Sequence, residues 1–525
     1  MTAPGAPLSA AGVLDAPLAA HPDHEAVVGR SGRLTYRQLD ELATRSAGAL
    51  LALGIGSGDR LAVSLPNDLP LVAAFHGAMR IGAVWVGVNR QLAPPEKRYL
   101  LDDAGASVVL ADADTAGQLE AAGAGTHAGR RLVVVGAGDG DEWSGLLEAV
   151  DPAATAATVA GVQVDPLAPA AIAYTSGTTG HPKGAVHSQH NLMLPGAVLV
   201  ATRGYGPSLR KADCFPLTIL NLQVLSTLLV AQAGGTAVVM DRVDPVGIAE
   251  WIEGERATVF NGAPAMLYSL TEHPDVRPEA LASLDDVWSG GSPCPEPTRR
   301  RFTAKFGLNV HTTYGLTEAP SMVAILAPGD PRNDTSGRPL PHLEVAVVGP
   351  DGRPVEAGAE GELVVGPALG GAWAGAWRPM LGYFGNEAAT RRAVQDGRLH
   401  TGDLGHLDED GYLHLIDRRS SLILRGGANV YPAEVERVID RFPGVAASCV
   451  VGTADDRLGE RVVAMVEPAA GCSLDADELR RHCEANLARY KVPERFVPGV
   501  LPRNSMGKVV RPDVQRALEG EGVPG

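Results

Sequence analysis

The stretch from Tyr174 to Ala185, YTSGTTGHPKGA, constrains this chain most strongly. The apolar run AAIAY that leads into it has the length of a short buried strand. The residues His187–Ala201 that follow have the pattern of a helix, which Ser188 can cap. A Gly-rich turn between a strand and a helix presents successive backbone N–H groups, and these form an anion-binding nest. The stretch therefore predicts a loop that binds a polyphosphate.

This loop is not a Walker A loop, because the Gly-Lys-Ser/Thr order is absent. The alternative is a surface turn, which a chain with 63 Gly forms readily. The order of hydroxyl, glycine and lysine residues favours phosphate binding, and the predicted binding residues are Thr175, Ser176, Gly177, Thr178, Thr179, Gly180 and Lys183.

Helix and strand patterns alternate from Leu34 to Ala111 and again from Ala170 to Val310. Alternation of this kind predicts two largely parallel, doubly wound sheets of an α/β fold, with helices on both faces. Thr35 is placed to cap the first long helix. Ligands bind at the carboxyl ends of the strands in such sheets. The expected strands of the second series are 236–240, 257–262, 284–291 and 308–315.

Other segments have sequence patterns of their own. Residues 112–165 are rich in Ala, Gly and Asp and are predicted to be irregular connections around one strand. The apolar segment 217–233 is predicted to be a buried helix that is too short and too polar to span a membrane. After Gly337, short strands and turns predict a small antiparallel barrel, and a compact α+β unit follows from about Arg418. We therefore expect domains at 1–417 and 418–525.

Composition excludes several classes of protein. The net charge of −16 argues against binding to nucleic acid, which needs a basic surface. The five cysteines are scattered and form no CxxC pair, so we expect reduced thiols in a cytoplasmic protein. No basic region precedes an apolar run at the N-terminus, so no signal peptide is predicted. A homodimer remains an open alternative.

Three further motifs follow the Gly-rich stretch. In TTYGLTE (312–318), Tyr314 offers a ring for stacking on a base, Thr317 a hydroxyl for a phosphate oxygen, and Glu318 an oxygen ligand for Mg²⁺. HTGDLG contains Asp403, and LPRNSMGKVVR contains Lys508. With GGSP (290–293), these motifs resemble in order the signatures of the adenylate-forming superfamily, which includes acyl-CoA synthetases, luciferases and peptide-synthetase adenylation domains. The resemblance covers the chain from about residue 34 to 511.

The resemblance implies ATP, Mg²⁺ and CoA as cofactors, a carboxylic acid as substrate, and a small C-terminal domain that rotates between two half-reactions. It implies that Asp403 holds the ribose hydroxyls, that Arg418 contacts ribose and phosphate, and that Lys508 is catalytic together with Thr317 and Glu318. Glycines 426 and 427 are expected against the pantetheine arm, because they lack side chains that would block it. The remaining nucleotide-site residues implied are Gly291, Ser292, Thr313, Gly315, Gly426 and Gly427. The implied acid-site residues are Ile219, Leu220, Gly290, Leu316 and Met322.

Three positions depart from the family pattern. Ser420 stands at the hinge position, Ile219 stands where a histidine or aromatic gate is frequent, and Thr312 replaces a frequent amide. The apolar or small side chains of the acid site favour a hydrophobic acid that is medium-chain aliphatic, alicyclic or aromatic. We expect free CoA as the acceptor, with a carrier protein or an amine as the alternative. A luciferase-like oxygenase and a non-catalytic nucleotide-binding scaffold are the other classes considered.

Overall fold

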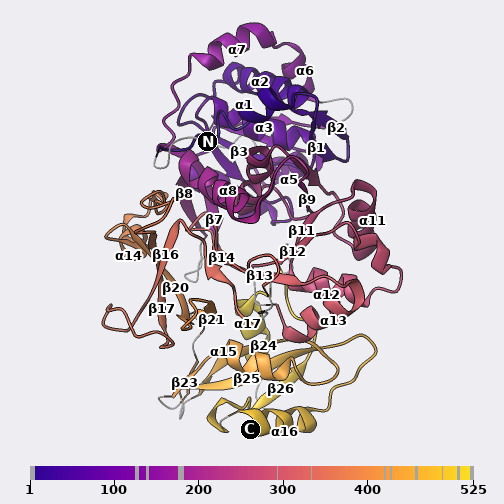
Figure 1. Ribbon diagram of the computed structural model, residues 1–525, viewed down its shortest axis with the longest axis vertical. Helices are drawn as coiled ribbons and strands as arrows, with labels where there is room; N and C mark the ends of the chain where they lie inside the picture. The colour runs from indigo at the N-terminus through magenta and orange to yellow at the C-terminus, as the bar shows by residue number, and fades with distance from the viewer. Residues whose placement is uncertain are drawn as a thin grey trace.

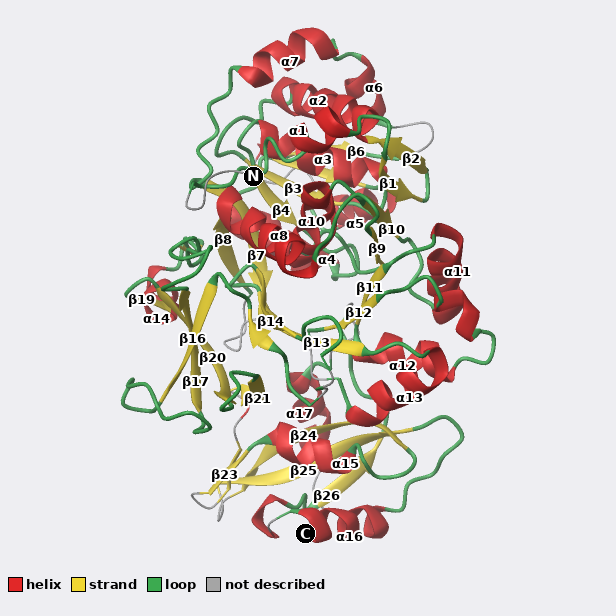
Figure 2. Ribbon diagram, viewed as in Figure 1, coloured by secondary structure: helices red, strands yellow, loops and turns green. Residues whose placement is uncertain are grey.

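The computed structural model describes residues 6–123, 129–136, 141–175, 182–291, 294–330, 332, 334–418, 421, 423–425, 428–455, 459–487, 489–504 and 509–520. The molecule is elongated, with helices α6 (Glu142–Glu148) and α7 (Pro152–Ala160) at one end and the C-terminal helix α16 (Ala476–Asn486) at the other (Figure 1). Helices lie over the strands in the N-terminal half of the chain, whereas other strands lie at the edge of the molecule beside loops (Figure 2).

The first sheet carries the Gly-rich stretch at one end of its strand β7. Its order is β18 (Gly382–Tyr383), β8 (Lys183–Ser188), β7 (Pro169–Thr175), β4 (Val84–Gly87), β3 (Arg60–Ser64), β5 (Val108–Ala111) and β6 (Arg131–Val134). From β7 to β6 in this order the neighbours are parallel, whereas β8 and β18 are antiparallel to theirs. The parallel connections run through α3 (Leu69–Arg80), α4 (Pro94–Ala104) and α5 (Ala113–Ala121).

The second sheet contains the four strands expected at 236–240, 257–262, 284–291 and 308–315, whereas the strand that opens the second series at Ala170 is β7 of the first sheet. Its order is β15 (Arg338–Pro339), β14 (Ser321–Ile325), β13 (Val310–Leu316), β12 (Asp286–Ser289), β11 (Val259–Gly262), β9 (Arg210–Asp213), β10 (Thr236–Val239), β1 (Glu25–Gly29) and β2 (Gly32–Thr35). The strands from β13 to β1 in this order are parallel. The crossover helices are α11 (Pro245–Glu255), α12 (Pro264–Glu272), the 3₁₀ turn η3 (Pro278–Leu281) and α13 (Glu296–Phe306).

The core lies between these two sheets. Helix α3 contacts β4 of the first sheet and β1 of the second. Helix α8 (Gln189–Arg203) contacts β7, and α10 (Leu229–Ala233) contacts both α8 and β10. The largest buried cluster accordingly joins Trp85 of the first sheet to Trp288 of the second. Around this core, α2 (Tyr36–Ala52) packs on α3, and α1 (Asp15–Ala20) packs on α2 and α10.

The caps predicted from the sequence are present. Thr35 accepts a hydrogen bond from the Gln38 backbone at the start of α2, where Gln38 completes a capping box. Ser188 accepts a hydrogen bond from the Asn191 backbone and begins α8. These two side chains fix where each helix starts relative to the strand before it.

A third sheet and a C-terminal unit complete the chain. The third sheet is antiparallel and consists of β16 (Leu343–Val348), β17 (Gly361–Pro367), β20 (Arg398–Leu407), β19 (Val394–Gln395) and β21 (Leu413–Arg418), with α14 (Glu387–Ala393) beside it. The C-terminal sheet contains β23 (Ala428–Val430), β22 (Ile423–Arg425), β25 (Gly459–Pro468), β24 (Val445–Asp455) and β26 (Arg495–Pro498). Its helices are α15 (Pro432–Ile439), α16 (Ala476–Asn486), the 3₁₀ turn η5 (Arg489–Lys491) and α17 (Arg511–Gly520).

Three local predictions need correction. The Gly-rich turn does not join a strand directly to a helix, because β8 lies between the turn and α8 and pairs with β7. Residues 112–165 are not irregular around their strand: they contain α5, α6 (Glu142–Glu148) and α7 (Pro152–Ala160). An aspartate caps each of these helices, which is why Ala- and Asp-rich sequence becomes helical here. The predicted helix at 217–233 is α9 (Leu220–Gln223), a π-helical turn η2 (Val224–Leu228) and α10.

In the part of the chain that the structure describes, no helix has the length and apolar character needed to cross a membrane. All five cysteines are free thiols, and only Cys472 is exposed.

Candidate active site

The carboxyl ends of β12 and β13 meet at one edge of the second sheet and leave no room for a side chain at Gly290. A Cβ atom at this position would lie 2.2 Å from the Thr313 hydroxyl oxygen. That hydroxyl donates a hydrogen bond of 3.3 Å to the Ser289 carbonyl. Gly291, with φ +83°, adopts a backbone conformation that favours glycine. The two glycines thus keep this edge of the sheet open beside Thr313.

Tyr314 and Asp403 are joined across two sheets. The Tyr314 hydroxyl donates a 2.7 Å hydrogen bond to Asp403 Oδ2, and both side chains are buried. Asp403 lies opposite Arg418 in the pairing of β20 with β21. Thr401 accepts a hydrogen bond from the Asp403 backbone N–H. The structure therefore brings together Tyr314 and Asp403, which are expected at adenine and ribose, and pairs the backbone of Asp403 with that of Arg418.

The turn after β13 carries Thr317 and Glu318. A Cβ atom at Gly315 would lie 1.9 Å from the Ser321 carbonyl oxygen, so only glycine permits this close approach of β13 and β14. His187 donates from Nε2 to the Thr317 carbonyl at 2.8 Å. Tyr383 donates from its hydroxyl to Glu318 Oε1 at 2.7 Å. Two side chains of the first sheet thus hold a turn of the second.

The ends of the Gly-rich stretch lie close to this turn. Thr175 and Lys183 are paired across β7 and β8, and the Thr175 hydroxyl lies 3.4 Å from the Lys183 carbonyl oxygen. The Lys183 Nζ lies 4.5 Å from the centre of the Tyr383 ring. A cation and a carboxylate therefore face the same tyrosine, one on its ring and the other on its hydroxyl.

Burial sets the electrostatics of His187. It lowers the pKa of this histidine to about 4, and the hydrogen bond to the Thr317 carbonyl opposes this only in part. Its Nδ1 atom is buried and has no hydrogen-bond partner among the described residues. The imidazole is therefore neutral at pH 7 and serves as a fixed donor to the turn.

Glu318 is the described side chain that the sequence assigns to Mg²⁺. The described residues contain no group of three His, Cys, Asp or Glu side chains that could hold a metal ion by themselves. Mg²⁺ keeps several water ligands and is commonly held by one or two carboxylates together with substrate phosphates. A single glutamate beside a predicted phosphate loop fits that mode of binding.

Four of the five expected acid-site residues belong to the main core or pack against it. Leu220, Leu316 and Met322 are buried in it, and the partly buried Ile219 packs against it. Met322 lies opposite Gly315 in the β13–β14 pairing, which places it beside the nucleotide-site residues.

Asn67 is hydrogen-bonded to the segment that carries Ile219 and Leu220. The Asn67 amide donates to the Phe215 and Met240 carbonyls at 2.8 and 3.1 Å, and its oxygen accepts from the Leu217 backbone at 2.8 Å. A Cβ atom at Gly87 would lie 1.7 Å from the Thr218 carbonyl oxygen. Both contacts bind the segment to the first sheet.

Several predicted site residues lie outside the described residues: Ser176, Gly177, Thr178, Thr179, Gly180, Ser292, Gly426, Gly427 and Lys508, as does Ser420 at the expected hinge. The C-terminal unit nevertheless contacts the second sheet's helices, since Arg441 forms an ion pair of 3.1 Å with Glu296 of α13. Sequence reasoning missed His187, Tyr383 and Asn67. Recognition of 183–188 as a strand would have placed Lys183 and His187 on one face.

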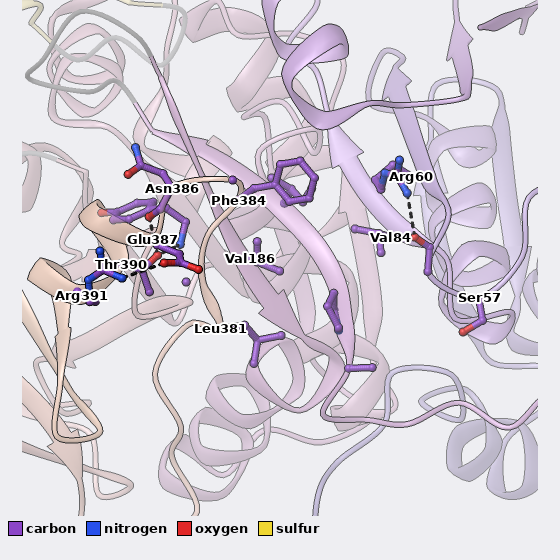
Figure 3. A pocket seen from close by; sticks show the side chains of 17 residues that line it. Ser57, Arg60, Val84, Val186, Leu381, Phe384, Asn386, Glu387, Thr390 and Arg391 are labelled. Carbon is purple, nitrogen blue, oxygen red and sulfur yellow. Dashed lines mark hydrogen bonds and ion pairs between the residues drawn. The ribbon is translucent and has the colours of Figure 1, made fainter. Parts of the chain in front are cut away.

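A cavity of about 1090 Å³ borders the first sheet (Figure 3). Its apolar lining includes Val84, Val186, Leu381 and Phe384. None of the residues predicted from the sequence lines this cavity, but Tyr383, which contacts Glu318 and Lys183, does line it, so the cavity adjoins the candidate site.

Comparison with known proteins agrees with this geometry. The chain matches the family described as AMP-binding enzyme over residues 14–370, and the AMP-binding enzyme C-terminal domain over residues 434–508. It is 35% identical over 501 residues to a feruloyl-CoA synthase from Amycolatopsis sp, which covers 94% of this chain and 96% of that protein. ATP-bound MatB from Rhodopseudomonas palustris aligns with a TM-score of 0.87 and 28% identity, over 97% of this chain and 99% of the other. The amide bond synthetase McbA from Marinactinospora thermotolerans aligns with a TM-score of 0.84, at the same identity and coverage. The chain therefore belongs to the AMP-binding enzymes, the adenylate-forming superfamily that its motifs indicate.

Proposed function

We propose that this protein activates a carboxylic acid with ATP, forming acyl-AMP and pyrophosphate, and then transfers the acyl group to CoA, releasing AMP. The observation that carries the proposal is that Lys183 and Glu318 both contact Tyr383. Glu318 follows the strand that carries Tyr314, whose hydroxyl is hydrogen-bonded to Asp403. This arrangement offers separate places for phosphates, a divalent cation, a base and a ribose. The relatives that act on acids and CoA support the same reading.

In the first step a carboxylate oxygen of the acid attacks the α-phosphorus of ATP, and the bond from that phosphorus to the pyrophosphate oxygen breaks. The carboxylate is already ionised at neutral pH, so the step needs alignment and charge screening rather than a base. Lys183 and the Thr317 hydroxyl would hold phosphate oxygens, and Lys508 would stabilise the charge that develops. Mg²⁺, when bound to Glu318 and the phosphates, would supply further charge neutralisation.

In the second step the CoA sulfur attacks the acyl carbonyl carbon, the bond to the AMP oxygen breaks, and the thiol proton passes to solvent. We assign residues 1–417 to the adenylating domain and 418–525 to a domain that turns near Ser420. This rotation would move Lys508 out of the site. It would bring Gly426 and Gly427 to the pantetheine arm, where glycines leave space for it.

We propose an aromatic or alicyclic acid that also carries a hydroxyl or carbonyl group. The site's apolar side chains suit a hydrophobic acid. The segment that bears them also contains the Thr218 hydroxyl, the Asn221 amide oxygen and the Gln223 amide nitrogen, all buried without a partner among the described residues. Buried polar atoms are rarely left without a hydrogen bond, so a polar group on the substrate would satisfy one of them.

An amine or a carrier protein as acceptor is the second candidate, since a protein of this fold at 28% identity is an amide bond synthetase. One assay separates the two: pyrophosphate release and thioester formation are measured across a panel of carboxylic acids, with and without CoA. We expect turnover to require CoA and to yield acyl-CoA. Rapid turnover with an amine and none with CoA would refute the CoA step. No pyrophosphate from any acid would refute the whole proposal.

A further inference from the structure

We propose that Tyr383 is a positioning residue that fixes Glu318 and Lys183 relative to each other before ATP binds. Its hydroxyl donates to Glu318 Oε1 at 2.7 Å, and its ring centre lies 4.5 Å from Lys183 Nζ. The side chain is 9% exposed, so it is held inside the protein. The inference rests on the proposed function, in which Glu318 binds a divalent cation and Lys183 binds phosphate.

The backbone around Tyr383 is fixed on several sides. Tyr383 pairs with Ala185 in the antiparallel contact of β18 with β8. Its N–H donates to the Thr390 hydroxyl at 2.8 Å, and the next N–H, of Phe384, donates to the Gly184 carbonyl at 2.7 Å. Figure 3 shows Thr390 of α14 and the neighbouring Asn386 on the segment that carries this strand. These hydrogen bonds fix the backbone that carries the Tyr383 side chain, and so fix the direction in which its phenol ring points.

The face of the first sheet that carries Tyr383 is the one that faces the Thr317–Glu318 turn. Alternate residues of a strand share a face, so Lys183 and His187 of β8 lie on the same side, and the pairing with Ala185 adds Tyr383 to it. His187 holds the turn by its backbone, through the Thr317 carbonyl. Tyr383 holds it by the carboxylate of Glu318. Of these two supports, Tyr383 is the one in contact with both charged groups.

The chemistry of a phenol suits this place. A neutral hydroxyl can orient a carboxylate without adding a positive charge that would repel a divalent cation. The face of the same ring attracts an ammonium group. Direct pairing of Lys183 with Glu318 would neutralise both groups, whereas separate contacts with the ring and the hydroxyl of Tyr383 leave the lysine available for phosphate and the glutamate available for metal.

The test is Tyr383→Phe, which keeps the ring beside Lys183 and removes only the hydroxyl. Mn²⁺ binding is measured by electron paramagnetic resonance in the presence of a non-hydrolysable ATP analogue, together with the Mg²⁺ dependence of pyrophosphate release. We expect Mn²⁺ affinity to fall by about tenfold to a hundredfold, as for loss of a hydrogen bond to a charged group. The reaction of preformed acyl-AMP with CoA should keep its rate.

Tyr412→Phe is the matched control, because the Tyr412 hydroxyl donates at the same distance of 2.7 Å to Asp330, another carboxylate. This control should leave Mn²⁺ affinity unchanged. If the wild type releases pyrophosphate and Tyr383→Phe binds Mn²⁺ with the same affinity as the wild type, the inference is overturned while the proposed function stands.

A double-mutant cycle with Glu318→Gln adds a readout that a merely structural role of Tyr383 would not move. If the tyrosine acts through Glu318, Tyr383→Phe should have no further effect on Mg²⁺ dependence once Glu318 is Gln. Additive losses would show that Tyr383 acts elsewhere, and would refute the positioning role even if the single variant proved less stable.

Discussion

The buried network around Asp286 makes a quantitative prediction. Asp286 Oδ2 lies 2.6 Å from Arg203 Nη2 and accepts from the Tyr205 hydroxyl at 2.8 Å, while Oδ1 lies 2.6 Å from His311 Nδ1. The arginine and aspartate side chains are 2% and 8% exposed. Burial alone would raise the pKa of Asp286, but the His311 hydrogen bond and the Arg203 charge outweigh it and hold the pKa at about 2.

Replacement of Asp286 by Ala leaves the Arg203 guanidinium buried without its carboxylate, which should lower the free energy of unfolding by about 3–5 kcal/mol. Urea unfolding followed by tryptophan fluorescence is the assay, because Trp288 lies with its ring centre 5.6 Å from the guanidinium carbon. The midpoint of the first transition is compared, since a chain with several units need not unfold in two states.

Glu387→Ala is the control for this measurement. Glu387 is paired with Arg391 on the surface, with side chains 89% and 71% exposed, and should contribute about 0.5 kcal/mol or less. Because the pKa of Asp286 is lowered in the folded protein, its stabilisation is present above pH 3.8, its ordinary value, and is lost as the pH falls toward 2. If Asp286→Ala costs no more than the control at pH 7, the reasoning about the buried charge is wrong.

Three further predictions concern the candidate site. His187→Asn should flatten the loss of stability between pH 6.5 and 4. Burial lowers the pKa of His187 to about 4, so as the pH falls through this window the unfolded chain takes up a proton that the folded protein does not, and stability is lost. An unchanged difference in unfolding midpoint across this range would contradict this prediction. Lys508→Ala should slow adenylate formation by roughly a hundredfold or more and spare the reaction of acyl-AMP with CoA; equal losses in both half-reactions would exclude the assigned role. Tyr314→Phe, which removes the hydrogen bond to Asp403, should raise the KM for ATP by about tenfold in pyrophosphate exchange; normal ATP kinetics would separate Asp403 from the nucleotide site.

The sequence predicts the parallel strands well because a strand buried on both faces is a continuous apolar run between turn residues. It fails at β8, where KGAVHS contains only two non-glycine apolar residues and the adjacent Gly-rich turn suggests an immediate helix. It also fails at α7, where no residue is buried and no apolar periodicity exists to be read. In both segments, pairing or capping decides the structure rather than hydrophobic pattern.

The candidate site shows the same division. Asp403 and Glu318 could be assigned because each lies in a motif, and in the structure they accept hydrogen bonds from Tyr314 and Tyr383. Tyr383 could not, because it lies in a Gly-rich segment and its partner is 65 residues away in sequence. Asn67 is further still from its partners, with 148 to 173 residues between donor and acceptor. Contacts of this range are set by tertiary packing and leave no local pattern in the sequence.

The anchoring of the segment at 215–218 bears on how selectivity for acids can diverge among proteins of this kind. Gly87 lies against the Thr218 carbonyl, and Asn67 is hydrogen-bonded to the backbone of Phe215 and Leu217. The backbone here therefore cannot shift to accommodate insertions or loop exchange. Under the proposed function, new selectivity would then come from exchanging side chains at positions such as 219, 221 and 223 on an unchanged backbone. Libraries restricted to these positions, with Asn67 and Gly87 kept, should give folded variants at high frequency, and this makes the segment a tractable place to redirect the enzyme toward other acids.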